Sequence, residues 1–142
     1  MKITYNKAIE FNESAKAWYR TQREETELSA AIDTMVERIR PHFEGKNGYN
    51  QRANSINRTT AVKDTKHKGA IVTNGYGQFQ YTQAGLDKRD ELMDVLGEEL
   101  IDIETIECGE VKDLTLEQRK IFSNVIKFNK ATIPILTLEP QN

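Results

Sequence analysis

Residues 21–29, Thr-Gln-Arg-Glu-Glu-Thr-Glu-Leu-Ser, decide how the first third of this 142-residue chain folds. On either side of them, apolar residues recur at spacings of three and four, which places each group on one face of a helix. The groups are Ala8, Phe11, Ala15 and Trp18, and then Ile32, Val36, Ile39 and Phe43. Between the two groups, the same stripe passes through the polar residues Gln22, Glu25 and Ser29.

Two structures satisfy this pattern: one long helix with a polar middle, or two helices that meet near residues 21–27. No proline or glycine occurs in residues 1–40, and Pro41 and Gly45 mark an end, so we predict one helix within residues 1–44. A helix of about 38 residues would be about 57 Å long, more than a small domain can cover. We therefore expect a homo-oligomer with these interface residues: Phe11, Trp18, Ile32 and Ile39.

Residues 45–68 are rich in asparagine, threonine and basic residues, with few large apolar side chains. This composition predicts a basic, mobile connection, and a short helix around residues 50–58 is the alternative within it. The remaining residues, 69–142, are predicted to form a small α+β domain.

Within residues 69–142, Asn74-Gly75 predicts a hairpin with a type I′ turn between strands at residues 70–73 and 78–82. A helix is expected at residues 83–96, and a strand at residues 100–108 whose alternation slips at Ile106, which indicates a bulge. Thr115 and Gln118 form a capping box for a helix that should reach Phe128. Pro134 indicates an edge strand or extended arm at residues 131–138. The predicted fold is α+β: a long N-terminal helix plus a small antiparallel sheet with two short helices.

Charge is strongly segregated along the chain. Residues 45–69 carry six basic side chains against one acid, residues 70–86 carry none, and residues 87–117 carry twelve acids against three bases. The basic segment suggests a site for an anionic small molecule, with these candidates for charge pairing and stacking: Arg52, Arg58, Lys63, Tyr49 and Tyr76. The acidic segment suggests a surface for a protein partner, with Asp90, Asp94 and Glu98 on it. Its charge would repel nucleic acid, so we do not expect a nucleic-acid partner.

Two acidic motifs raise a third function, that of a metal-dependent nuclease. Asp102-Ile103-Glu104 places two carboxylates on one face of a strand, where they could share a magnesium ion. Glu110-Val111-Lys112 has the bare shape of a nuclease E-x-K motif. The simpler interpretation is the solvent face of a charged strand, and we predict no catalytic residue, no metal site and no cofactor.

Composition limits the remaining possibilities. The chain is 37% hydrophobic and 30% charged, and its single cysteine, Cys108, excludes an intramolecular disulfide and a cysteine-based zinc site. No apolar run approaches the roughly 18 residues that a membrane span needs, and the N-terminal residues lack an apolar signal core. We therefore expect a cytoplasmic protein.

The chain resembles small accessory proteins of tailed bacteriophages in pattern, mostly over residues 69–128. The resemblance rests on the hairpin Gly-Gln-Phe-Gln-Tyr-Thr at residues 77–82, the segment Asp-Glu-Leu-Met-Asp-Val-Leu-Gly-Glu-Glu-Leu at residues 90–100, and the capped helix after it. It implies a viral protein that acts by binding, for example as an inhibitor of host defence. We predict a non-enzymatic binding protein acting through protein–protein contact. A protein that sequesters an anionic nucleotide and a small nuclease are the alternatives.

Overall fold

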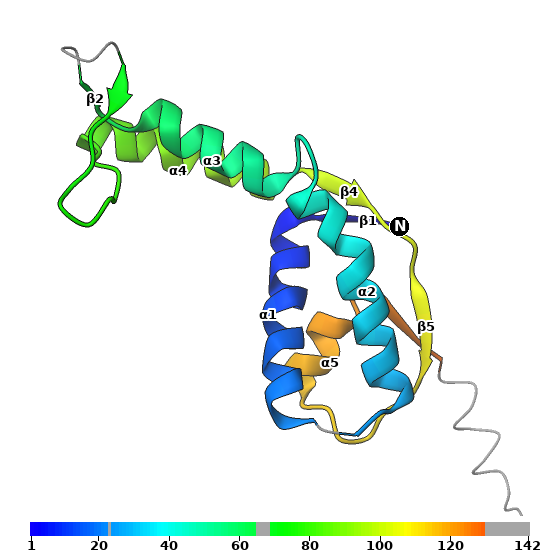
Figure 1. Cartoon of the computed structure of the whole chain (residues 1–142). Coiled ribbons are helices and arrows are strands. Elements are labelled where there is room, and N and C mark those ends of the chain that lie inside the picture. Colours follow the sequence, from blue (N-terminus) through cyan, green and yellow to red (C-terminus); the bar gives the residue numbers. More distant parts are fainter. Residues whose placement is uncertain (23, 65–68, 130–142) are drawn as a thin grey trace, which may run out of the picture. The chain divides into compact units, whose positions relative to one another are not determined.

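The computed structural model describes residues 1–22, 24–64 and 69–129, and these form two compact units (Figure 1). Unit 1 contains residues 1–40 and the described residues from Leu100 onward, whereas unit 2 is Pro41–Glu99. About 56% of the described chain is helical and about 16% is in strands, which agrees with the predicted α+β class. The boundaries differ from the predicted segments 1–44, 45–68 and 69–142, because unit 1 is built from both ends of the chain.

The N-terminal segment forms two helices and not the single long helix that we predicted. Helix α1 spans Tyr5–Thr21 and helix α2 spans Glu27–Glu44. The break is stabilised at the start of α2, where the Thr26 and Ser29 side chains each accept a hydrogen bond from the other residue's backbone N–H, at 3.1 and 2.8 Å. These bonds satisfy backbone donors that the first turn of a helix leaves unpaired. Of the polar residues in the middle of the stripe, Gln22 and Glu25 thus lie outside both helices, and Ser29 lies in the first turn of α2.

The core of unit 1 contains the residues that we had expected at an oligomer interface. Phe11, Ile32 and Ile39 are completely buried within one chain, and Trp18 is 5% exposed. The ring of Phe122 packs edge-on against Phe11 and Trp18, with centroids 5.8 and 6.0 Å away. The predicted interface is therefore wrong at these four positions, because the apolar stripes of α1 and α2 are covered inside unit 1.

The predicted strand at residues 100–108 is interrupted. Strand β4, Leu100–Asp102, pairs antiparallel with β1, Lys2–Thr4. After three residues outside any strand, β5, Ile106–Gly109, pairs in parallel with β6, Ile126–Asn129. The slip of the pattern at Ile106 thus marks a change of partner strand, where we had expected a bulge.

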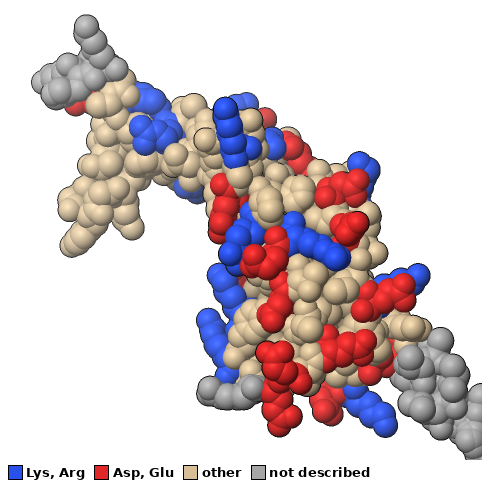
Figure 2. All heavy atoms as spheres, turned by 45° about the vertical axis from the view of Figure 1, so that its right-hand side comes forward, with Lys and Arg blue, Asp and Glu red and all other residues tan. Residues whose placement is uncertain are grey.

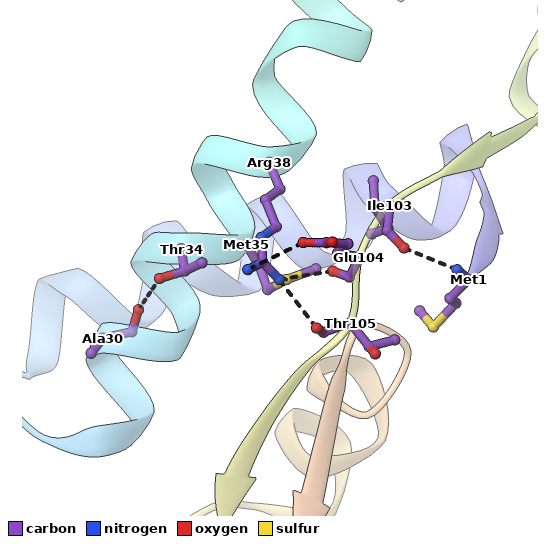
Figure 3. Close-up of polar contacts among 8 residues, drawn as sticks. All are labelled: Met1, Ala30, Thr34, Met35, Arg38, Ile103, Glu104 and Thr105. Atoms are coloured by element: carbon purple, nitrogen blue, oxygen red, sulfur yellow. Dashed lines mark hydrogen bonds and ion pairs between the residues drawn. The ribbon is translucent and has the colours of Figure 1, made fainter.

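Arg38 of α2 stabilises this interruption. Its Nη1 donates hydrogen bonds to the carbonyl oxygens of Glu104 at 3.0 Å and Thr105 at 3.2 Å (Figure 3). Carbonyls that leave a strand ladder need another donor, and the guanidinium group supplies it. The Met1 amine is a further donor at this interruption, since it donates to the carbonyl of Ile103 at 3.0 Å (Figure 3).

Helix α5, Leu116–Phe122, begins with the predicted capping box, in which Thr115 accepts from the Gln118 N–H and Gln118 accepts from the Thr115 N–H. The helix ends at Phe122, six residues before the predicted end at Phe128. Val125 and Ile126 are buried as expected, but they lead into β6 and do not continue the helix. The predicted single antiparallel sheet is replaced by two-stranded pairs, one of them parallel. The expected extended segment at residues 131–138 lies outside the described residues.

Unit 2 is a pair of helices with short strands at one end. It contains α3, Tyr49–Thr60; β2, Lys63–Asp64; β3, Ala70–Ile71; and α4, Gln83–Gly97. Helix α3 matches the short helix considered for residues 50–58, whereas the mobility of residues 45–68 stays a prediction. Strands β2 and β3 pair antiparallel, and Thr73 and Phe79 form a single bridge.

The turn at Asn74 differs from the predicted type I′ turn, because neither Asn74 nor Gly75 has a positive φ. Instead, the Gly77 N–H donates to the Asn74 carbonyl at 3.0 Å, and Gly77 has a φ of +78°. This pattern fits a three-residue hairpin loop with glycine in the left-handed position. The Asn74 side-chain oxygen accepts from the Tyr76 and Gln78 N–H groups, at 2.8 and 3.1 Å, and fixes the loop.

Candidate functional site

The helices α3 and α4 lie side by side and run antiparallel (Figure 1). At one end, Gly85 of α4 lies so close to α3 that a Cβ on it would be 2.6 Å from the carbonyl oxygen of Thr60. At the other end, Arg52 of α3 forms a two-bonded ion pair with Glu99, just after α4, and one bond measures 2.7 Å. A close backbone contact and a bidentate ion pair thus fix the two ends of the helix pair.

Although the two helices are in contact, few of their side chains are fully buried. No residue of α3 is buried, and Leu96 and Gly97 are the buried residues of α4. We give the name apolar face to the partly exposed apolar residues of the two helices: Tyr49, Ala53, Ile56, Leu86, Leu92 and Met93. Two helices bury only the seam between them, so a pair of helices without a second layer leaves such residues in contact with water.

Beside the apolar face, α4 carries an exposed row of carboxylates. We call Asp90, Asp94 and Glu98 the acidic ridge; all three are exposed and follow one another at intervals of four residues. This spacing places Asp90 and Asp94 on one side of α4, as the sequence predicted, and Glu98 is the residue directly after the helix. The Arg89 guanidinium lies 3.3 Å from Asp90, but Arg89 also stacks on the ring of Tyr81 at 4.8 Å. The ridge is therefore a negative surface of unit 2 with little compensating charge on its own helix.

The hairpin at the end of unit 2 presents a different kind of surface. Residues 72–83 contain no Lys, Arg, Asp or Glu, and they form the uncharged projection visible at the end of unit 2 in Figure 2. Tyr76, at the tip, is 92% exposed. The base of the hairpin is connected by backbone hydrogen bonds from Val62 to Gln80, from Gln80 to Val72 and from Val72 to Val62, at 2.8, 3.1 and 2.9 Å. An aromatic side chain is thus held on a braced loop.

The five residues predicted to bind an anionic ligand have different neighbours within unit 2. Arg52 is paired with Glu99, and Lys63 donates to the carbonyl oxygens of Arg58 and Ala61. The guanidinium of Arg58 lies 5.9 Å from the ring centroid of Phe79.

The two predicted tyrosines lie in different environments. Tyr49 packs against Phe43 at 5.1 Å, at the start of α3. Tyr76 is at the tip of the hairpin, which extends from the opposite end of the helix pair. Arg58 and Lys63 therefore lie together, whereas the two tyrosines lie apart, and the binding of an anionic ligand by these residues stays a prediction.

A cavity of about 400 Å³ in unit 1 lies between the α1–α2 connection and residues 109–113, with Trp18, Glu27, Leu28 and Glu110 among its lining residues. A neighbouring cavity of about 290 Å³ shares Glu27, Gly109 and Glu110 with it. The carboxylates here have structural partners: Glu27 accepts from the Gly109 N–H at 3.2 Å, and Glu110 pairs with Arg119 at 2.8 Å. The Glu110 side chain is only 8% exposed.

The three carboxylates of the nuclease hypothesis are each engaged elsewhere. Asp102 lies 3.0 Å from the Met1 amine, Glu104 lies 3.8 Å from Arg38, and Glu110 pairs with Arg119. Among the described residues, no group of three or more histidine, cysteine or acidic side chains could hold a metal ion. Glu110-Val111-Lys112 follows β5 and does not lie on a strand. Nothing in the described chain therefore assembles these residues around one ion.

Cys108 is 1% exposed in β5. Burial raises the pKa of its thiol to about 11, and the nearby Glu27 and Glu110 carboxylates contribute in the same direction. The thiolate is the nucleophilic form of cysteine, so this side chain is inert at neutral pH.

Comparison with known proteins gives no relative: no family model, no curated protein and no solved structure matches this chain. Among the described helices, none is both long enough and apolar enough to cross a bilayer. The candidate site therefore rests on the geometry of unit 2 alone. The sequence singled out the acidic ridge by its charge, and its role in binding stays a prediction. It did not single out the apolar face, because α3 was interpreted as a mobile connection.

Proposed function

We propose that this chain is a non-enzymatic binding protein and that unit 2 makes the contact with its protein partner. The observation that carries the proposal is the incomplete burial of the apolar face on α3 and α4. Apolar side chains held in a fixed helix pair gain free energy when a partner removes them from water. A helix pair that leaves these residues partly exposed is suited to contact with a partner.

Two further features of unit 2 fit a protein partner. Tyr76 and Met93 belong to the residue types enriched at the centre of protein interfaces, and both are accessible. The acidic ridge would attract a partner with a basic surface and raise the rate of association. Binding as the mode of action also agrees with the resemblance to phage accessory proteins, which suggested the same role.

The experiment compares capture of partners by three forms of the full chain, expressed with a tag in the cells that naturally contain the protein. The test variant reverses the acidic ridge: Asp90→Lys, Asp94→Lys and Glu98→Lys. The control variant makes the same change in charge on unit 1, at three exposed acids of α1 and α5: Glu10→Lys, Glu13→Lys and Glu117→Lys. Captured proteins are quantified by mass spectrometry.

We expect a specific protein to be enriched by the wild type and by the control variant, and to be lost with the reversed ridge. With the purified partner, the association rate of the wild type should fall steeply as salt rises, since surface charges are screened over about 8–10 Å at physiological ionic strength. Equal capture by both variants, or no enriched protein with the wild type, would contradict the proposal.

A further inference from the structure

The hairpin of unit 2 carries an aromatic side chain that its own fold does not cover. Tyr76, at the tip, is 92% exposed. The other two aromatic rings of the hairpin are only partly exposed, because the guanidinium of Arg58 lies over Phe79 and that of Arg89 over Tyr81. Burial of an aromatic side chain removes about 150–250 Å² from water. The ring of Tyr76 therefore keeps nearly all of this area for association.

The backbone on both sides of Tyr76 is fixed by Asn74. The Asn74 side chain accepts from the Tyr76 and Gln78 N–H groups, at 2.8 and 3.1 Å, and donates to the Gln78 side-chain oxygen at 2.9 Å. Its backbone N–H donates to the Gln78 carbonyl at 2.9 Å, and its carbonyl accepts from Gly77 at 3.0 Å. A loop that is ordered before binding loses less conformational entropy on association than a flexible one. The hairpin thus presents Tyr76 on a preorganised support.

The chemistry of the hairpin selects the class of partner. Nucleic acids and anionic lipid headgroups are bound mainly through lysine and arginine, and residues 72–83 contain neither, nor any acid. The hydrocarbon of a membrane would leave exposed amides such as that of Gln80 without hydrogen bonds. Tyrosine, glycine and asparagine, which form the tip at residues 74–77, are enriched in antibody loops that bind proteins. An uncharged pocket on a protein fits this tip.

We propose that the tip of the hairpin is a contact site for the protein partner and that Tyr76 inserts into an uncharged pocket on that protein. This rests on the proposed function, in which unit 2 binds a protein, and it adds a contact of a different kind from the acidic ridge. The ridge attracts the partner through its charge and acts on the association rate. A buried tyrosine holds the complex together, so the hairpin acts on the dissociation rate.

The first test uses photo-crosslinking with the full chain in the cells that naturally contain the protein. The photoreactive amino acid p-benzoylphenylalanine replaces Tyr76 in the test form and Leu116 in the control form. Leu116 is a matched control, because it is also 92% exposed but lies in unit 1. After irradiation, we expect a covalent adduct at position 76 with the protein that the acidic ridge captures, and no such adduct at position 116.

The second test measures binding of the purified partner to Tyr76→Ala. The dissociation constant should rise at least about 10-fold, mainly through faster dissociation, whereas reversal of the acidic ridge should mainly slow association. Tyr76→Phe keeps the ring and should retain most of the affinity, and Leu116→Ala should bind as the wild type does. Because Tyr76 is exposed, these changes should leave the melting temperature unchanged.

Adducts at position 76 with lipid or nucleic acid alone, or equal adducts at both positions, would overturn the proposal. So would an unchanged dissociation constant in Tyr76→Ala. If the partner still depends on the acidic ridge in that case, the hairpin contact is wrong and the proposed function stands. If the wild type captures no protein, both proposals are wrong.

Discussion

The two units of this protein differ in how completely they bury their apolar side chains. Unit 1 contains seventeen of the nineteen buried apolar residues among the described part of the chain, whereas unit 2 contains Ala61 and Leu96. Three helices and two strand pairs surround one core in unit 1, but α3 and α4 are a single layer. Burial of apolar surface is the main favourable term in folding. We infer that unit 1 is stable by itself and that unit 2 depends on what it contacts.

From this difference we infer different roles for the two units. In unit 1, the free energy gained by burying apolar side chains already stabilises the fold and is not available for association. A unit with a fixed backbone and uncovered apolar residues still has free energy available for association, which is typical of binding surfaces. We therefore expect substitutions in the two units to differ in the size and the reach of their effects.

The largest effect should come from Phe122→Ala in the core of unit 1. Phe122 is completely buried and contacts the rings of Phe11 and Trp18. Loss of a buried aromatic ring leaves a cavity and costs about 3–5 kcal/mol. Urea unfolding followed by fluorescence of Trp18, the single tryptophan of the chain, measures this change within unit 1.

The matched control for Phe122→Ala is Leu116→Ala at the other end of the same helix, because Leu116 is 92% exposed. Its effect should stay within about 0.5 kcal/mol. Comparable destabilisation by the two variants would show that unit 1 lacks the dense core described above.

The next effect should be confined to unit 2. In Gly85→Ala, the new methyl group would lie 2.6 Å from the Thr60 carbonyl oxygen, so α3 and α4 must separate. Overpacking of this kind costs about 1–3 kcal/mol, which exceeds the gain of up to about 1 kcal/mol from replacing glycine by alanine in a helix. Hydrogen exchange of the α3 and α4 amides should become faster, with unit 1 unchanged.

Gly75→Ala is the control in the same unit, because nothing lies within 4 Å of a Cβ at that position. It should leave exchange in both units as in the wild type. If Gly85→Ala also speeds exchange in α1, the two units unfold together and the contrast between them fails.

A smaller effect is expected from Thr115→Ala, which removes the capping box of α5. The lost bond between the Thr115 side chain and the Gln118 N–H should cost about 1 kcal/mol. Because α5 contributes Phe122 to the core, the loss should appear as a lower melting temperature for all of unit 1. Thr115→Ser, which keeps the hydroxyl, should restore most of it; no recovery would mean that the cap is not the cause.

Local signals in the sequence predicted several features of the fold correctly. The capping box at Thr115, the helix at residues 83–96 and the acidic side of α4 depend on residues close together in the chain, so their physical causes can be recognised from spacing. The apolar positions of α1 and α2 were also correctly identified as helical faces. The prediction of what covers those faces was wrong. The absence of glycine and proline favoured one continuous helix, whereas Thr26 and Ser29 can cap a new helix only if the chain turns there.

Features that depend on distant parts of the chain were not predictable in this way. Ile126 pairs with Ile106 across twenty residues, and the helical spacing of Val125 and Ile126 with Ile121 and Phe122 favoured a longer α5. The candidate site shows the same limit. Asp90, Asp94 and Glu98 were singled out because they lie close together in the chain. The apolar face combines α3 with α4, and Arg52 was assigned to a ligand although its partner is Glu99.

The smallest predicted effect concerns that ion pair and the pH dependence of unit 2. The hydrogen bonds from Arg52 hold the pKa of Glu99 below its ordinary value of 4.5. A carboxyl group whose pKa is lower in the folded state stabilises the fold above its unfolded pKa, and this contribution is lost as pH falls through the folded pKa. Because both side chains are more than a third exposed, solvent screening limits it to less than about 1 kcal/mol. In Glu99→Gln, α3 and α4 amides should therefore exchange somewhat faster than in the wild type at pH 7, and the difference should shrink as pH falls below 4.5, after correction for intrinsic exchange rates. High salt should shrink it as well, and unit 1 should be unaffected. A difference that grows as the pH falls would mean that Glu99 acts through packing and not through its charge.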